Sequence, residues 1–375
     1  MRLPTPSHCV SWEASSLTGI ASLKCRTKAV PPISETGVVI KVKAIGLNFA
    51  DIFCVLGVYE AANKMLSDGS PPNSGGMAQA AGSFCPGLEF SGEVVAVGAA
   101  VTNIGVGDRV YGFTRFGAYR TVVVQDAAYL RRVPDSWSYA EAAALVVTGL
   151  TAWHGLVELG NVKRGRRVLI HSAAGGVGTA AMQICTSLGA PPTGVVGAES
   201  KATWLQERFP EAEVLVRGRE RDYAAQLAAL PGGGRFDCVL DSLGGAYFSA
   251  ALESLEPMGR IVHFGATYSY GGASGGLRKW LTLVPGYLTR PRLDPGQLVG
   301  TNRAVMGFNL IWLTERVEML TAELDEMLLK GGLLVRPPAV GKSFPFEELP
   351  QALHYLNSGA SVGKVVVEVG AEEPA

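Results

Sequence analysis

The sequence lacks any excess of charge of one sign. Its 375 residues include 33 lysines and arginines and 33 aspartates and glutamates, so the formal net charge is zero. A chain without a concentrated positive field is a poor candidate for nucleic-acid binding. Long apolar runs are also lacking, because no stretch reaches the roughly 18 residues of a membrane span. The nearest, around residues 280–287, contains Pro285 and Gly286.

Cysteine pairs and a secretory leader are lacking too. The six cysteines stand at positions 9, 25, 54, 85, 185 and 238, and none forms a C-x-x-C pair. This spacing is typical of reduced cysteines and indicates neither a zinc knuckle nor a disulfide framework. Residues 1–10 have no apolar segment of the kind found in signal peptides. We therefore expect a cytoplasmic protein.

Glycine, in contrast, is abundant. Much of the 47 glycines falls between short apolar runs, which is typical of an α/β protein with many tight turns. The first third of the chain alternates between apolar and polar residues and predicts a small β domain. Its strands are expected at 37–44, 92–97, 109–113 and 119–124. Residues 60–85 are rich in Gly, Ser, Pro and Ala, and predict a long surface loop.

The middle of the chain predicts a second domain of a different kind. Short apolar runs at 166–172, 194–197, 236–242 and 259–265 alternate with helix-like segments. Strands and helices in alternation indicate βαβ units and a parallel sheet buried on both faces. Further elements are expected later: a strand at 305–310, helices at 314–330 and 346–357, and a final strand at 363–369.

A glycine-rich turn follows the first apolar run of this second domain. The dinucleotide fingerprint G-x-G-x-x-G has glycines that let the backbone approach a pyrophosphate at a helix N-terminus. Here its three positions are Ala173, Gly175 and Gly178, with Gly176 as an additional small residue. A turn without any ligand is the alternative. A strand before the turn and a helix after it favour the dinucleotide site.

The end of the next strand bears on which dinucleotide is bound. NAD-binding proteins place an acidic residue there to bind the ribose 2′-hydroxyl. In this sequence the position is Gly197, and Ser200 and Lys201 follow as possible donors to a 2′-phosphate. Lys201 as a solvated lysine is the alternative, and Glu199 is expected to point outward. The hypothesis is therefore NADPH as the cofactor.

Several motifs in order resemble the medium-chain dehydrogenase/reductase superfamily, in its zinc-less quinone oxidoreductase branch. The likeness is strongest to the vesicle amine transport protein homologues. The motifs are GLNFAD (46–51), PGLEFSG (86–92), VGDRV (106–110), EAAAL (141–145), HSAAGGVG (171–178), DSLGG (241–245), NRAVMGFNL (302–310) and VGKVVV (362–367). The resemblance implies a bilobal α/β fold. A GroES-like β domain of residues 1–138 and 332–375 would flank a Rossmann doubly wound parallel-sheet domain of 139–331.

The zinc ligands of this superfamily are not present in the sequence. Zinc alcohol dehydrogenases carry a G-H-E motif, which reads Gly87-Leu88-Glu89 here, and a cysteine that GLNFAD lacks. Catalytic zinc needs about three protein ligands. We therefore expect no metal, and a reaction in which hydride passes to an acceptor that is already electrophilic.

The resemblance implies roles for residues near the acceptor. Asn48 would lie over the nicotinamide and polarise the acceptor carbonyl, with capping of its own loop as the alternative. Asp51 would orient that loop, and Tyr59 would donate its phenolic proton to the product oxyanion. Cofactor contacts are implied at further positions, which are Thr151, Ala174, Gly175, Gly176, Val177, Ser242, Leu243, Phe264, Gly265, Ala266, Phe308, Asn309 and Lys364.

Other residues are expected to have no part in the chemistry. His171 is expected to be a packed core histidine, and His154 and His263 show no partner pattern of a catalytic triad. Arg217 and Gly218 stand where the family has a tyrosine near the adenosine, so that contact stays unassigned.

Two functions remain open on this basis. The first is an NADPH-dependent reductase of a quinone or an α,β-unsaturated carbonyl. The second is a non-catalytic protein that holds NADPH or lipid at a membrane surface, because residues 277–292 mix basic with aromatic and apolar side chains. A loop over the substrate cleft is the alternative for that segment. The family also predicts a homodimer that pairs the strand at 305–310.

Overall fold

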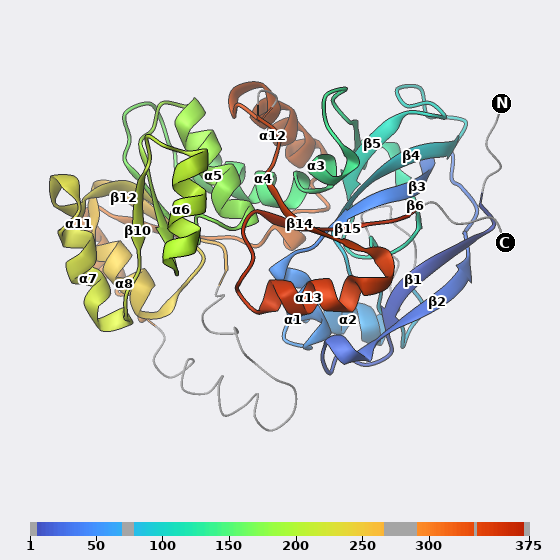
Figure 1. Cartoon of the computed structure of the whole chain (residues 1–375), viewed down its shortest axis with the longest axis horizontal. Coiled ribbons are helices and arrows are strands. Elements are labelled where there is room, and N and C mark those ends of the chain that lie inside the picture. The colour runs from blue at the N-terminus through green and yellow to red at the C-terminus, as the bar shows by residue number, and fades with distance from the viewer. Residues whose placement is uncertain (1–5, 70–78, 266–290, 334–335, 371–375) are drawn as a thin grey trace. The chain divides into compact units, whose positions relative to one another are not determined.

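The chain folds into two compact units. The computed structural model describes residues 6–69, 79–265, 291–333 and 336–370 (Figure 1). The first unit comprises Met1–Val147, Ile311–Ala322 and Pro337–Ala375, and the second comprises Thr148–Leu310 and Glu323–Arg336. Compared with the predicted limits of 1–138, 139–331 and 332–375, this division assigns residues 139–147 and 311–322 to the first unit.

The first unit is built on a mostly antiparallel sheet with the strand order β14-β15-β3-β4-β5-β7, and β6 also pairs with β3. Only β14 and β15 run parallel to each other. Its core contains Ile40, Val42, Phe90, Val110 and Leu353. The strands are β3 (Gly37–Gly46), β4 (Glu89–Val97), β5 (Arg109–Phe113), β6 (Val122–Asp126), β7 (Leu130–Arg132), β14 (Val340–Pro345) and β15 (Lys364–Glu368), with β1 (His8–Ala14) and β2 (Leu23–Ala29) paired separately.

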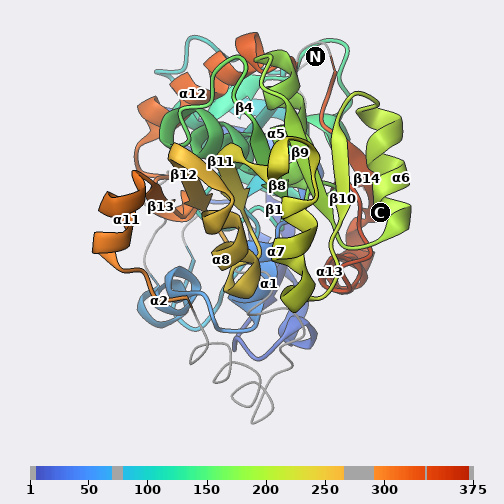
Figure 2. The same ribbon diagram turned by 90° about the vertical axis from the view of Figure 1, so that its left-hand side faces the viewer.

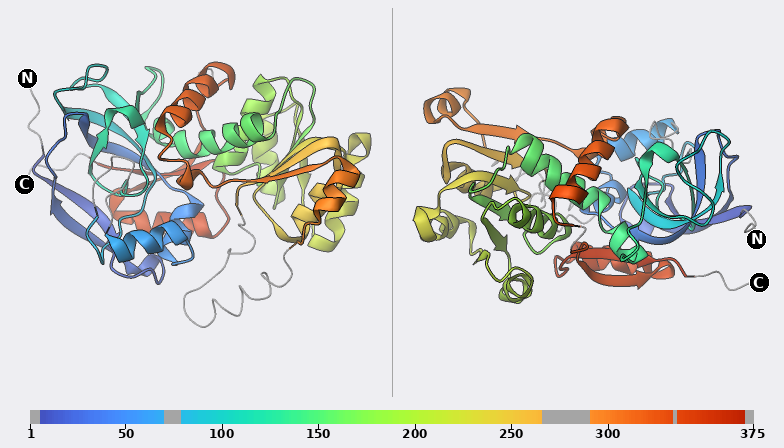
Figure 3. Two further views of the ribbon diagram at one scale, coloured as in Figure 1. Left: turned by 180° about the vertical axis from the view of Figure 1, so that it is seen from behind. Right: turned by 90° about the horizontal axis from the view of Figure 1, so that it is seen from above.

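Short helices complete the first unit. They are α1 (Phe49–Val55), α2 (Glu60–Asp68), α3 (Tyr139–Ala143) and α13 (Leu349–Asn357), together with 3-10 turns at Ile20–Ser22, Ala127–Tyr129, Leu310–Trp312 and Phe346–Glu348. The helix α3 begins at a capping box in which Ser138 and Glu141 exchange hydrogen bonds. The helix α13, drawn in red in Figure 3, contacts α1 and the strands β14 and β15.

The second unit is a six-stranded parallel sheet with the order β10-β9-β8-β11-β12-β13. This is the doubly wound order, in which the chain reverses direction across the sheet between β8 and β11. Its strands are β8 (Val168–His171), β9 (Pro192–Val196), β10 (Glu213–Val216), β11 (Phe236–Asp241), β12 (Leu255–His263) and β13 (Ala304–Gly307).

Helices pack on the faces of this parallel sheet. The helices α5 (Gly176–Ser187) and α6 (Glu199–Arg208) contact β8, β9 and β10, whereas α7 (Glu220–Ala228) and α8 (Gly245–Glu253) pack together (Figure 2). Further helices are α4 (Val146–Trp153), a π-helix at His154–Leu159, a 3-10 turn at Pro231–Gly234, α11 (Pro295–Thr301) and α12 (Val317–Lys330). The predicted fold class, a GroES-like β domain with a Rossmann domain, is confirmed.

One prediction about the fold was wrong in part. Residues 60–85 were expected to form a loop, but Glu60–Asp68 form the helix α2, which ends at Gly69 in the left-handed conformation. The reason is burial, because Ala61, Ala62 and Met65 lie on one face of the helix in an apolar cluster with Phe84. Residues 70–78 of the same segment lie outside the described residues.

Among the helices of the described residues, none is both long enough and apolar enough to cross a bilayer.

Candidate functional site

The glycine-rich turn joins β8 to α5 in the second unit. Gly175 is the N-cap of α5, so no side-chain oxygen of the N-cap residue accepts from the first N–H groups of this helix. The first N–H groups of a helix have no intrahelical acceptor, which makes such a terminus a binding site for phosphate. A Cβ atom on Gly178 would lie 2.3 Å from the Ser172 carbonyl oxygen, so only glycine permits this close approach of helix and strand. Contact of Ala174, Gly175, Gly176 and Val177 with a cofactor stays a prediction.

Two cations lie at the ends of β9 and β10. Gly197 directly follows β9, and a Cβ atom on it would stand 3.4 Å from the Arg217 guanidinium. The Arg217 N–H donates to the Val196 carbonyl oxygen, which fixes this backbone beside the end of β9. Burial, and then the positive charge of Arg217, lower the pKa of Lys201. The structure therefore brings Gly197 and Lys201 together and adds Arg217, which sequence reasoning had left unassigned.

Arg217 is held in place from its other side by Tyr247. Arg217 Nη1 donates to the Tyr247 hydroxyl oxygen at 3.0 Å, and its guanidinium carbon lies 4.9 Å from the ring centre. No carboxylate of the described residues is within ion-pair distance of Arg217. A fixed guanidinium without a protein counterion is suited to phosphate. Ser200 and Glu199 are exposed in the first turn of α6.

The carboxyl ends of β11, β12 and β13 carry most of the remaining predicted cofactor contacts. Ser242 and Leu243 follow β11 and are buried, and the Ser242 hydroxyl donates to the Ser172 hydroxyl at 2.9 Å. Phe264 and Gly265 follow β12. Ligands of open α/β sheets bind outside these strand ends. The structure thus gathers these residues at one sheet edge.

Aromatic contacts define the end of β13. Phe308 follows this strand, and its ring centre lies 5.0 Å from that of His154 and 6.3 Å from that of Phe264. Asn309 is exposed beside it. Ala266 lies outside the described residues, as does most of the segment 277–292 that was considered for membrane contact. Thr151 is buried within α4.

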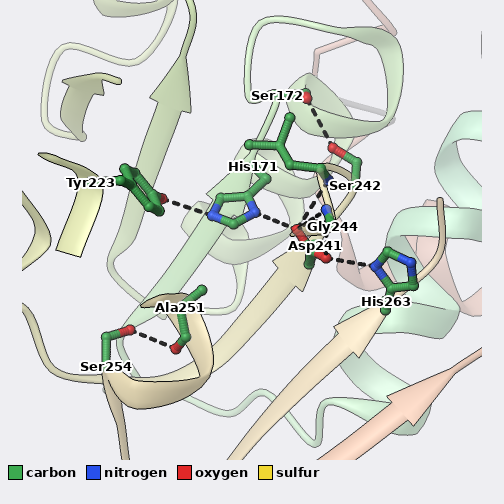
Figure 4. Close-up of polar contacts among 10 residues, drawn as sticks. His171, Ser172, Tyr223, Asp241, Ser242, Gly244, Ala251, Ser254 and His263 are labelled. Atoms are coloured by element: carbon green, nitrogen blue, oxygen red, sulfur yellow. Dashed lines mark hydrogen bonds and ion pairs between the residues drawn. The ribbon is translucent and has the colours of Figure 1, made fainter. Parts of the chain in front are cut away.

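A buried carboxylate connects three strands at this edge, as Figure 4 shows. Asp241 Oδ1 lies 2.5 Å from His171 Nδ1, and Asp241 Oδ2 lies 2.6 Å from His263 Nδ1. The N–H groups of Leu243 and Gly244 also donate to this carboxylate. Burial raises the pKa of Asp241, but the hydrogen bonds from the two histidines outweigh it and hold the pKa well below its usual range.

His154 and His263, which show no triad pattern in the sequence, each have a carboxylate partner in the structure. His263 pairs with Asp241, and His154 Nδ1 lies 3.1 Å from both carboxylate oxygens of Glu323. Neither pairing has a sequence signal, because Asp241 and Glu323 are reached only through the fold. His171 is buried as expected.

In the first unit, the predicted residues Asn48 and Lys364 belong to one buried cluster with Glu89. Lys364 Nζ lies 2.5 Å from Glu89 Oε1 and 2.6 Å from Asn48 Oδ1. Asn48 Nδ2 donates to the same Glu89 oxygen at 3.0 Å, and Glu89 Oε2 accepts from the Val147 N–H at 2.9 Å. The Asn48 amide and the Lys364 ammonium thus form hydrogen bonds with each other and with Glu89 inside this unit. Direct contact of either with an acceptor or a cofactor stays a prediction.

Asp51 and Tyr59 lie on the helices next to this cluster. The Asn48 N–H donates to Asp51 Oδ2 at 2.8 Å, which ties Asp51 to the Asn48 loop. Asp51 Oδ1 and the Tyr119 hydroxyl are both buried, and the tyrosine hydroxyl interacts with the Asp51 carboxylate. Burial raises the pKa of Asp51 to about 6, although the Asn48 N–H and the charge of Lys364 oppose the shift. Tyr59 is half-buried at the start of α2, and its acid role stays a prediction.

We expect Asp51→Asn to change how stability depends on pH. An acid whose pKa is raised by folding contributes stability that is full below its ordinary value of 3.8 and is lost as the pH passes 6. Such a shift corresponds to about 3 kcal/mol. The variant should therefore gain stability relative to the wild type between pH 4 and pH 8, measured by urea unfolding. Glu35→Gln, at an exposed carboxylate, is the control. If the stability of Asp51→Asn followed pH in the same way as that of the wild type, the raised pKa of Asp51 would be contradicted.

The residue at the superfamily's zinc-ligand position packs among apolar side chains. Leu88 lies in a cluster with Cys54, Phe84 and Phe116. Across the described parts of the chain, no group of three His, Cys, Asp or Glu side chains is arranged to hold a metal ion.

Comparisons with known proteins agree with this architecture. Residues 34–135 match the alcohol dehydrogenase GroES-like domain, and residues 176–320 match the zinc-binding dehydrogenase domain. The synaptic vesicle membrane protein VAT-1 homolog of Rattus norvegicus is 31% identical over 92% of this chain and 80% of its own length.

Solved structures give the same result. CurK enoyl reductase has a TM-score of 0.78 at 27% identity, covering 96% of this chain and 99% of its own. A mycobacterial protein solved in complex with NADPH has a TM-score of 0.77 at 28% identity, covering 96% of this chain and 99% of its own. Quinone oxidoreductases are also among the matching structures.

The fold and its glycine-rich turn are those of an oxidoreductase with a nicotinamide cofactor domain. The chain belongs to the medium-chain dehydrogenase/reductase superfamily, in the zinc-less branch that includes the quinone oxidoreductases. Within that branch it stands near the VAT-1 homologues.

Proposed function

We propose that this protein is an NADPH-dependent oxidoreductase that transfers hydride to a quinone or an α,β-unsaturated carbonyl. The observation that carries the choice of cofactor is the pair of cations Lys201 and Arg217 beside Gly197. A dinucleotide whose pyrophosphate lies at the N-terminus of α5 places its adenosine ribose near the end of β9. Two cations there, where NAD-binding proteins have a carboxylate, favour a 2′-phosphate.

The residues present fit such a cofactor along the whole sheet edge. Gly178 permits the close packing of α5 on the end of β8 that the turn needs, and Ser242, Phe264 and Phe308 line the half of the edge beyond the β8–β11 reversal. When bound, the cofactor supplies a hydride, and the protein supplies position and hydrogen bonds. The matched CurK structure is an enoyl reductase, which supports an acceptor with a double bond conjugated to a carbonyl.

The donor set of the first unit supports an acceptor that needs no metal activation. Leu88 stands at the histidine position of G-H-E and packs against apolar neighbours. Alcohol oxidation in this superfamily uses a zinc ion as Lewis acid, whereas a quinone or an enone is already electrophilic. Asn48, held by Glu89 and Lys364, is the amide that we propose orients the acceptor carbonyl.

We expect Lys201→Ala/Arg217→Ala to weaken NADPH binding by at least about 100-fold, because each of the two charged hydrogen bonds contributes roughly 1.5–3 kcal/mol. NADH binding should change by less than about threefold, since NADH carries no 2′-phosphate. Isothermal titration with both cofactors is the measurement. Arg221→Ala is the matched control, because Arg221 is exposed nearby on α7 and pairs only locally with Asp222. Equal binding of NADH and NADPH by the wild type would overturn the NADPH proposal.

The alternative is a non-catalytic protein that holds NADPH or lipid at a membrane. It has support in the name of the rat relative, synaptic vesicle membrane protein VAT-1 homolog. NADPH oxidation with a panel of quinones and enones separates the two. Tight NADPH binding without oxidation of NADPH by any acceptor would favour the alternative. Sedimentation of the protein with anionic liposomes would in addition support peripheral membrane contact.

We also propose that the protein forms a homodimer through β13. This strand is at the sheet edge, paired only with β12 among the described strands, and exposed edge strands invite pairing. Met258 and Val299 are 73% and 79% exposed beside it. Light scattering should give twice the mass of 39.4 kDa. Met258→Glu/Val299→Glu should give a monomer, whereas Leu329→Glu, at an equally exposed leucine on α12, should not.

A further inference from the structure

His263 differs from His171, which contacts the same Asp241 carboxylate, in that one of its ring nitrogens is open. Its side chain is 34% exposed, whereas those of His171 and Asp241 are completely buried. Nδ1 is fixed at 2.6 Å from Asp241 Oδ2. Nε2 has no hydrogen-bond partner among the described residues and points away from the carboxylate in Figure 4.

The hydrogen bonds around Asp241 define where the protons lie. An ionised carboxylate only accepts, so the Nδ1 atoms of both histidines carry the hydrogens that face it. Burial raises the pKa of Tyr223 well above its ordinary value, so its hydroxyl donates to His171 Nε2 at 2.8 Å. His171 is thereby satisfied on both nitrogens. His263 Nε2 is the one position of this network that can exchange a proton with a ligand or with water.

Asp241 is the titratable group that the His263 side chain contacts among the described residues. From β11 it faces Asp241, and from β8 and α7 it is linked through Asp241 to His171 and Tyr223. From α8 the Phe248 ring packs against it at 5.8 Å. From the end of β13, the Phe308 N–H donates to its carbonyl oxygen. The Asp241 carboxylate therefore fixes the His263 ring through Nδ1.

His263 ends β12, on the half of the sheet beyond the reversal between β8 and β11. A dinucleotide that spans a doubly wound sheet places its adenosine half over β8, β9 and β10 and its second half over β11, β12 and β13. The cations Lys201 and Arg217 already mark the adenosine half. The open nitrogen of His263 thus lies at the end where the nicotinamide and the acceptor meet.

We propose that His263 is the general acid of the reduction, an inference that rests on the proposed hydride transfer. An α,β-unsaturated carbonyl that accepts the hydride and its two electrons at the β-carbon becomes an enolate. The enolate α-carbon takes the proton from His263 Nε2, a C–H bond forms as the N–H bond breaks, and the imidazolium becomes neutral. Water then returns a proton to Nε2. With a quinone, the same proton goes to the oxyanion of the reduced ring.

The first test follows the histidine itself by NMR. His263 signals in 15N-histidine-labelled protein are identified by their loss in His263→Gln. In the wild type, NADPH is expected to shift the Nε2 signal of His263 while the His354 signals stay unchanged. If NADPH leaves the His263 signals unmoved, the residue does not face the cofactor and the assignment is overturned. This measurement is made on the wild type and does not require turnover. His263→Gln is needed only to identify the His263 signals.

The second test measures turnover with an enone as a function of pH. His263→Gln is expected to lower kcat about 100-fold, as loss of a general acid does. The decline of kcat toward high pH that is expected in the wild type should be absent from this variant. The NADPH dissociation constant should change by less than about threefold. His354→Gln, at an exposed histidine on α13, should behave as the wild type. An unchanged pH profile in His263→Gln overturns the acid role alone, whereas no turnover by the wild type overturns the proposed function.

Discussion

Replacing Lys364 by methionine is expected to destabilise the first unit by about 3–5 kcal/mol, because it leaves the buried carboxylate of Glu89 without its cation. Lys364 and Glu89 are 3% and 0% exposed, and their charged atoms are 2.5 Å apart. Water cannot replace the ammonium at such a depth. Urea unfolding followed by tryptophan fluorescence measures the loss.

A second substitution separates lost charge compensation from lost packing. Lys364→Met/Glu89→Gln should recover most of the stability, because glutamine removes the buried charge and still accepts from the Val147 N–H. Lys24→Met, at an exposed lysine on β2, should change the free energy of unfolding by less than about 0.5 kcal/mol. A double variant as unstable as Lys364→Met would show that the methylene packing of Lys364, not the ion pair, carries the effect.

Gly178→Ala is expected to weaken NADPH binding by at least about tenfold and to destabilise the second unit by about 3 kcal/mol, as overpacking of a rigid contact does. The added Cβ atom would lie 2.3 Å from the Ser172 carbonyl oxygen and 2.5 Å from the Ala173 Cα atom. Both are backbone atoms, so α5 must move away from β8. The N–H groups that we propose hold the pyrophosphate move with it. Isothermal titration with NADPH and thermal unfolding are the measurements.

Gly300→Ala is the matched control for this prediction. Gly300 lies in α11, its backbone is not in the left-handed region, and an added Cβ atom meets no atom within 4 Å. Alanine there should leave NADPH binding unchanged and stability equal or slightly raised. Unchanged NADPH affinity in Gly178→Ala would mean that the cofactor phosphates are bound elsewhere than at the turn.

The sequence by itself determined those features that depend on neighbours along the chain. Hydrophobic periodicity placed the parallel strands, and the glycine spacing of 175–178 placed the turn, because both signals are local. The ends of strands were less certain: the predicted strand at 305–310 ends at Gly307. The helix α2 was missed because its apolar residues are too few to outweigh the Gly- and Ser-rich surroundings.

Tertiary structure alone decided which polar side chains meet. Arg217 follows β10, and only the pairing of β10 with β9 brings it beside Gly197. Asp241 lies 70 residues from His171 and 22 from His263, and the parallel alignment of β8, β11 and β12 places all three at one edge. Local sequence signals do not extend over such separations. The chain thus encodes the glycine-rich turn in its local sequence, whereas the pair of Lys201 with Arg217 and the contacts of Asp241 with His171 and His263 form only on folding.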